Sequence, residues 1–149
     1  MTPHLWALRV RSTEPGVATV ITRKHRFEAG QSAEFDEESP HISALEYVLG
    51  ALGADLAAGF AGHARRSGAL VDQVEAVVQG ELNDPLAALG VVGAKGHPGI
   101  ARVRVTVYVS SLESPARLLE LWEESARASP LLHTFRAACY VEVRVTIVP

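Results

Sequence analysis

The chain has 149 residues, of which 48% are hydrophobic, and a formal net charge of -3 at pH 7. This length and composition are typical of a protein with one sizeable core, so we expect a single domain over 1–149. The negative charge argues against a nucleic-acid surface, which needs a basic face. The N-terminus lacks a basic segment followed by an apolar run, so the sequence predicts no signal peptide and a cytoplasmic location.

The first third of the chain predicts two strands followed by a long helix. Residues 5–11 and 17–28 have strand patterns, and Glu14-Pro15-Gly16 is a turn signal between them. After an acidic loop, Ser43 stands at the expected N-cap of a helix, with Glu46 at capping-box spacing. We expect this helix to run to about residue 66, because Ser-Gly follows there.

The rest of the chain alternates strands and helices. The predicted elements are strands over 71–82, 100–110 and 141–148, and helices that begin at the two Ser-Pro pairs, Ser114-Pro115 and Ser129-Pro130. Consecutive strands joined by hairpins, with the helices in blocks, indicate an α+β fold with antiparallel sheets around the long helix.

The long helix is apolar on every side apart from one carboxylate, Asp55. Such a helix is expected to be buried, and an unpaired buried carboxylate costs several kcal/mol as an order of magnitude. Asp55 therefore needs a partner or a proton. The candidate partners are the cations Arg23, Arg26, His133 and Arg136. The carboxylates of Glu46 and Asp55 within one membrane thickness argue against a membrane span.

Other residues with reactive side chains give weak signals. Cys139 is the single cysteine, which excludes an internal disulfide and a cysteine-rich zinc site, and its strand parity predicts a buried, inert thiol. His41 and His133 are candidate acid–base groups or metal ligands, although packed or capping histidines are commoner. No two histidines stand at ligand spacing, and the glycine-rich loop near residue 95 lacks a phosphate-binding ending. We therefore predict neither a metal nor a cofactor.

Two segments resemble the signatures of OsmC-like proteins, a family that includes organic-hydroperoxide-resistance proteins. SALEYVLGALGADLAAG resembles the central-helix signature, whose commonest form is Asn-Pro-x-Glu-Leu-Leu-Leu-Ala-Ala-Leu-Gly-Ala-Cys. ARASPLLHTFRAACYVEV resembles a second signature, in which Cys-Pro opens a short helix before the last strand. The order of the elements is also that of the family. The resemblance implies an OsmC-like fold and an intertwined homodimer.

The resemblance also implies where the family's chemistry has been lost. Members with activity are cysteine-dependent peroxidases, and their peroxidatic and resolving cysteines correspond to Asp55 and Ser129. A carboxylate and a hydroxyl cannot form the sulfenic acid and disulfide that such a reaction needs. The glutamate of the hydroperoxide branch falls at Leu45, whereas Glu46 matches other branches, and the family arginine could be Arg23 or Arg26.

Three functional hypotheses remain open from the sequence. The first is a non-enzymatic protein that binds a small, largely apolar molecule in the former peroxide pocket at the dimer interface. The second is an enzyme in which Asp55 acts as general acid or base. The third is a residual oxidative-stress role through Cys139. The candidate pocket residues are Asp55, Glu46, His41, His133, Arg23, Arg26 and Arg136.

Overall fold

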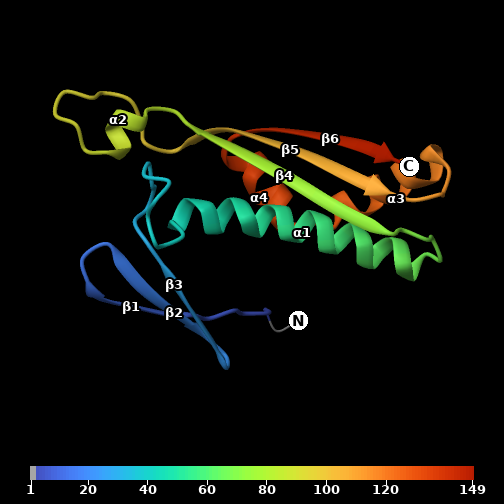
Figure 1. Ribbon diagram of the computed structural model, residues 1–149, viewed down its shortest axis with the longest axis horizontal. Helices are drawn as coiled ribbons and strands as arrows, with labels where there is room; N and C mark the ends of the chain where they lie inside the picture. Colours follow the sequence, from blue (N-terminus) through green and yellow to red (C-terminus); the bar gives the residue numbers. More distant parts are fainter. Residues whose placement is uncertain (1–2) are drawn as a thin grey trace. The chain divides into compact units, whose positions relative to one another are not determined.

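The computed structural model describes residues 3–149, and the chain contacts divide it into two compact units (Figure 1). One unit ends at Val48 and the other comprises Leu49–Pro149. The long helix α1, Ala44–Arg66, begins in the first unit and belongs to the second from Leu49 onward. The expectation of a single domain remains a prediction.

The first unit contains a three-stranded antiparallel meander in the order β1-β2-β3. Its strands are β1 (Arg9–Glu14), β2 (Val17–Thr22) and β3 (His25–Ala29). The expected single strand over 17–28 is wrong, because the chain reverses between Thr22 and His25. Arg23 adopts a positive φ of 52° there, a conformation that usually favours glycine, so the turn had no composition signal.

The first strand is also displaced from its predicted position over 5–11. Pairing starts at the Pro15-Gly16 turn and extends outward only as far as the six residues of β2 allow, so that Arg9 pairs with Ile21. The exposed Leu5 and Trp6 therefore lie outside the ladder.

A capping box starts α1, as the sequence predicts. The Glu46 backbone N–H donates to Ser43 Oγ at 3.1 Å, and Glu46 Oε2 accepts from the Ser43 backbone N–H at 2.7 Å. These two bonds satisfy donors that every helix N-terminus leaves without an intrahelical acceptor. The helix ends at Arg66, and Gly68 follows with a φ of 77°.

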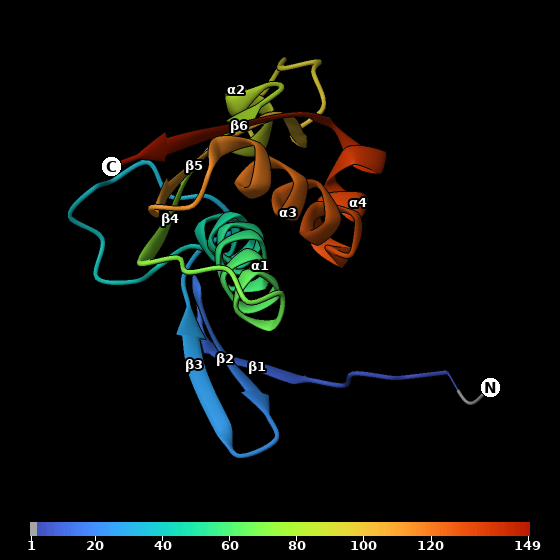
Figure 2. The same ribbon diagram turned by 90° about the vertical axis from the view of Figure 1, so that its right-hand side faces the viewer.

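The second unit is a three-stranded sheet with helices on one face, as Figures 1 and 2 show. Its elements after α1 are β4 (Gln73–Leu82), α2 (Pro85–Ala88), β5 (Ile100–Ser110), α3 (Pro115–Arg127), α4 (Pro130–Ala138) and β6 (Tyr140–Val148). The sequence predicts β5 and the starts of α3 and α4 correctly, and it misses the single turn of α2.

The sheet is not wholly antiparallel, which corrects one part of the sequence prediction. β4 and β5 form an antiparallel hairpin, but β6 pairs with β5 in parallel, with Val105 beside Val143. The reason is the connection: α3 and α4 lie between the two strands in sequence and return the chain to the same end of the sheet, a crossover that a parallel pair requires.

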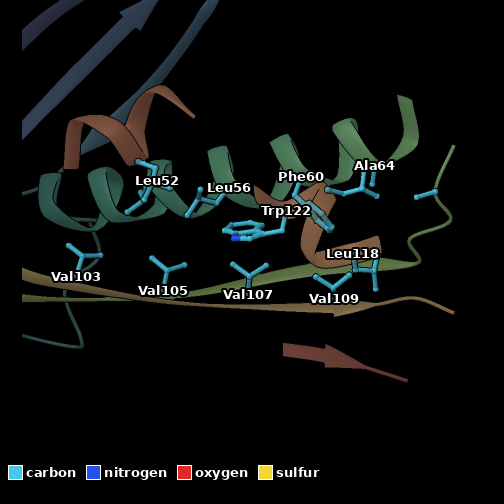
Figure 3. Close-up of a cluster of buried hydrophobic side chains, with 13 residues drawn as sticks. Leu52, Leu56, Phe60, Ala64, Val103, Val105, Val107, Val109, Leu118 and Trp122 are labelled. Atoms are coloured by element: carbon cyan, nitrogen blue, oxygen red, sulfur yellow. The ribbon is translucent and has the colours of Figure 1, made fainter. Parts of the chain in front are cut away.

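The core of the second unit lies between α1, α3 and β5. Valines at every second position of β5 face a stripe of α1 at helical spacing, and Trp122 and Leu118 of α3 fill the space beside them (Figure 3). The ring centroids of Phe60 and Trp122 are 5.8 Å apart. The buried members of α1 are Leu52, Gly53, Leu56, Phe60 and Ala64.

Within residues 49–149, the rest of the second unit covers one face of α1. Ala51, Ala54 and Ala58 lie on the faces that this unit leaves exposed, and the expectation of cover on every side stays a prediction. By length and composition α1 could cross a membrane, but its buried stripe packs against β5 as the core helix of a soluble fold does.

Candidate functional site

Asp55 and Ser129 meet at the N-terminus of α4. Ser129 is the N-cap of that helix, is buried, and its hydroxyl donates to Asp55 Oδ2 at 2.5 Å. The same carboxylate oxygen accepts from the backbone N–H of Leu131 at 3.3 Å. Ser129 Oγ in turn accepts from the Leu132 N–H at 3.0 Å. Asp55 is therefore held by a hydroxyl, a backbone amide and the positive end of a helix dipole.

This arrangement does not include the expected pairing of Asp55 with His133 or Arg136, while a pairing with Arg23 or Arg26 of the first unit stays a prediction. Within residues 49–149 Asp55 forms no ion pair. His133 is exposed, and its Nε2 lies 2.8 Å from the carbonyl oxygen of Arg127, to which it donates when protonated there. Arg136 is exposed on α4. The N-terminus of α4 takes the place of the predicted cation because Asp55 is half-buried, not fully enclosed, and two donors suffice.

The other predicted site residues belong to the first unit. Arg23 lies in the β2–β3 turn and Arg26 on β3, and both are exposed. Glu46 is engaged in the capping box, and hydrogen bonds from Ser43, the backbone N–H first, hold its pKa below the usual value. His41 is half-buried, with Nδ1 3.9 Å from Glu28 Oε2. His41 and Glu46 line a shallow hollow with the acidic loop that precedes α1.

Cys139 lies apart from Asp55, at the C-cap of α4. Its side chain is half-buried, and its thiol donates to the carbonyl oxygen of Phe135 at 3.5 Å. Burial raises the pKa of the Cys139 thiol, so the thiolate is less populated at neutral pH than in a free cysteine. The thiol predicted to be buried is therefore only half-buried, and its inertness stays a prediction.

A cleft of about 300 Å³ opens beside Asp55 between α1 and the end of α3. Its apolar lining residues are Leu56, which is only 2% exposed, and Ala128, and Gly59 leaves the middle of the α1 side without a side chain. A Cβ added at Gly59 would lie 3.8 Å from Ser125 Oγ, an ordinary van der Waals contact, so this position accepts a side chain that then lies against α3. The remaining lining residues are Asp55, His63, Arg66, Glu124, Ser125 and Ser129.

A histidine and a carboxylate close the rim of the cleft as a hydrogen-bonded pair. His63 Nε2, on α1, lies 2.8 Å from Glu124 Oε2, on α3. Arg66 also lines the rim and, among residues 3–149, forms no ion pair. No group of three or more His, Cys, Asp and Glu residues within 3–149 is placed to hold a metal ion.

The sequence interpretation missed His63, Arg66, Glu124 and Ser125 as members of this site. One signal was available for the α1 residues. Positions 55, 59, 63 and 66 recur at spacings of four, four and three, so they form one stripe along the helix. The α3 residues had no such signal, because only the packing of α3 against α1 brings them to the cleft.

The family model of OsmC-like proteins matches residues 36–144, which include α1, Asp55, Ser129 and the cleft. The chain belongs to the OsmC-like family. No curated protein matches this OsmC-like chain.

Solved structures share the fold over nearly the whole length. The OsmC-like protein from Mycoplasma pneumoniae has a TM-score of 0.80 at 15% identity, with 100% of both chains covered. An organic hydroperoxide resistance protein OsmC from Legionella pneumophila has a TM-score of 0.70 at 12% identity, covering 97% of this chain and 99% of that one. A Vibrio cholerae protein described as an organic hydroperoxide resistance protein has a TM-score of 0.66 at 12% identity, covering 97% and 94%.

At these identities the structural likeness establishes the α+β OsmC-like fold. Membership of a family that contains hydroperoxide resistance proteins suggests a function related to oxidative stress.

Proposed function

We propose that this OsmC-like protein binds a small, largely apolar organic molecule in the cleft beside Asp55 and does not reduce peroxides. The observation that carries the proposal is the 2.5 Å hydrogen bond between Ser129 Oγ and Asp55 Oδ2. By the resemblance, these two residues occupy the positions of the peroxidatic and resolving cysteines. The close approach of the two positions is retained, while the sulfur chemistry is absent.

The reaction of the cysteine-dependent relatives cannot take place at this pair. A thiolate attacks the peroxide oxygen, becomes a sulfenic acid and then condenses with a second thiol. Neither Asp55 nor Ser129 has a sulfur atom, and the carboxylate is already an acceptor for two donors. The site can therefore fix the orientation of α4 and border a ligand, but it has no redox step.

The cleft has the properties of a small-molecule site. Its volume of about 300 Å³ is at the lower end of the range for ligand pockets, and an apolar surface with a few polar groups is the usual composition. The Vibrio cholerae relative was solved with a molecule of captopril bound in one of its active sites. A small organic molecule thus fits a site of a protein with this fold, which supports a similar use of the cleft here.

The two enzymatic alternatives receive less support from the contacts. A general acid or base needs a neighbouring group that adjusts its pKa and an open cavity for the substrate. Neither His133 nor Arg136 contacts Asp55 to provide such a group. A role for Cys139 needs an accessible thiolate, whereas its thiol is half-buried, hydrogen-bonded and has a raised pKa.

We also propose that the protein acts as a homodimer in the cytoplasm, with the cleft at the dimer interface. The exposed alanines of α1 support this proposal, because an apolar helix needs burial on several faces and a second protomer would bury these residues. The soluble fold of the family supports the location without deciding the compartment.

The test of ligand binding uses a neutral probe and a variant that fills the cleft. We expect 4-phenylbutan-1-ol to shift the amide NMR signals of Leu56, Gly59 and Ala128 saturably in the wild-type protein. Gly59→Leu places a side chain inside the cleft against Ser125, so these shifts should disappear. Ala116→Leu introduces the same side chain at an exposed position on α3 and should leave binding unchanged. Equal binding by wild type and Gly59→Leu would overturn the proposal, as would no saturable shift in the wild type.

A further inference from the structure

Each of the two carboxylates that line the cleft has a hydrogen-bond partner within it. Asp55 is compensated by the Ser129 hydroxyl, the Leu131 amide and the N-terminus of α4. Glu124 is hydrogen-bonded to His63, whose Nε2 lies 2.8 Å from Glu124 Oε2. Both negative groups therefore already have partners inside the cleft.

Arg66 is the cleft's uncompensated charge. It lines the cleft and is exposed, and none of the carboxylates in residues 3–149 lies within ion-pair distance of it. Its Nη1 lies 3.2 Å from where a Cβ on Gly62 would stand, so the guanidinium extends back along α1 over this glycine. A guanidinium has five donors in a planar fork that matches a carboxylate or phosphate.

The distance along the helix separates this charge from the apolar part of the cleft. Gly59 and Arg66 are seven residues apart on the same stripe of α1, and because the guanidinium extends back over Gly62, the charge lies about one helical turn, roughly 5 Å, from Gly59 along the axis. The apolar surface of Leu56 and Ala128 lies toward the Asp55 end, and the free guanidinium lies toward the C-terminal end of α1. A ligand that fits both parts has an apolar body and one anionic end.

We infer that the ligand of this cleft is a small amphipathic organic anion, such as an arylalkanoic acid, whose carboxylate pairs with Arg66. The inference rests on the proposed function, because it names the chemical class of the molecule bound at the same site. The apolar body of the ligand covers Leu56, Gly59 and Ala128. Its anionic end lies at the rim of the cleft, beside the His63–Glu124 pair.

The test compares two probes with the same apolar body, 4-phenylbutanoate and 4-phenylbutan-1-ol. We expect the wild-type protein to bind the acid roughly threefold to fivefold more tightly than the alcohol, the ratio for an exposed ion pair worth up to about 1 kcal/mol. Higher salt should reduce this preference, because the pair is accessible to counterions. Dissociation constants would come from the NMR shifts of the Gly59 and Ala128 amides.

Arg66→Gln is the decisive variant, and Arg65→Gln is its matched control. Both arginines lie in the last turn of α1, but Arg65 does not line the cleft. Arg66→Gln should bring the two affinities close to equality, while Arg65→Gln should keep the preference for the acid. Equal affinities in the wild type, or an equal loss in both variants, would overturn the anionic ligand and leave the cleft proposal standing. Absence of binding by both probes would overturn the cleft proposal itself.

Discussion

Ser129 and Asp55, 74 residues apart in the sequence, share a 2.5 Å hydrogen bond in which the serine hydroxyl donates. The bond joins the middle of α1 to the N-cap of α4, and Ser129 simultaneously caps α4 through the Leu132 N–H. One serine thus serves a local helix and a tertiary contact, so its removal should cost more than the loss of an ordinary cap.

A double-mutant cycle measures this contact. Ser129→Ala should destabilise the protein by about 2–3 kcal/mol, since it removes a cap and a hydrogen bond to a carboxylate. Ser114→Ala removes the corresponding Ser-Pro cap of α3, which has no carboxylate partner, and should cost about 1 kcal/mol. We expect a coupling of about 1–2 kcal/mol between Asp55→Ala and Ser129→Ala, and almost none with Ser114→Ala. Denaturant melts at one protein concentration give all these values, and full additivity of the first pair would show that the bond contributes nothing.

Peroxide chemistry provides the second prediction. We expect no catalytic consumption of cumene hydroperoxide with dithiothreitol as reductant, because Asp55 and Ser129 have no sulfur. Cys139 should react with iodoacetamide at pH 7 more slowly than N-acetylcysteine does, since its raised pKa lowers the thiolate fraction. Its rate should rise roughly tenfold per pH unit and level off only at a higher pH than that of an ordinary thiol, because its pKa is raised. Turnover that Cys139→Ser abolishes would establish the oxidative role of this thiol.

The third prediction concerns the close approach of α1 to the sheet. A Cβ added at Gly53 would lie 2.9 Å from Val78 Cγ2, whereas one added at Gly50 meets no atom within 4 Å. Gly50→Ala should be neutral or stabilising by up to about 1 kcal/mol, because alanine is the better helix former. Gly53→Ala should instead destabilise by about 1–2 kcal/mol through overpacking against a stiff side chain. Combining Gly53→Ala with Val78→Ala should recover part of the loss, and thermal melts that show the two glycine variants alike would contradict the packing.

Glu46 provides a prediction in pH. Its pKa is lowered by hydrogen bonds from Ser43, the backbone N–H first, so its ionised form is favoured in the folded state. A lowered folded-state pKa contributes stability that is complete above the unfolded-state pKa and is lost as the pH falls through the folded-state value. The wild type should therefore exceed Glu46→Gln in stability at pH 7, and the difference should shrink in acid. Glu37→Gln, which removes an exposed carboxylate, is the control, and a difference that stayed constant from neutral to acid pH would refute the capping role of the charge.

Assembly is the fifth prediction. Because α1 exposes Ala51, Ala54 and Ala58 although the helix is apolar, we expect an obligate dimer with an interface larger than ~1,600 Å². Sedimentation equilibrium at micromolar concentration should detect only the dimer. A folded monomer under these conditions would mean that the exposed face of α1 is stable in water.

The sequence by itself determined the elements whose signals are local. The boundaries of α1 follow from the Ser43–Glu46 capping box and from Gly68, and the two Ser-Pro pairs set the starts of α3 and α4. Alternating valines gave β5 its bounds and its buried face. These predictions hold because caps, proline and strand alternation act between residues that are neighbours in the chain.

Only the tertiary structure decided the turn at Arg23, the parallel pairing of β6 and the partner of Asp55. The turn uses a backbone conformation that arginine does not signal, and the direction of β6 depends on where α3 and α4 return the chain. Asp55 attracted a predicted cation because a sequence shows formal charges, whereas a helix N-terminus offers its donors without one. The cleft likewise forms only where α3 brings Glu124 and Ser125 against α1. That packing depends on the contact between Phe60 and Trp122, two residues that are far apart in the chain.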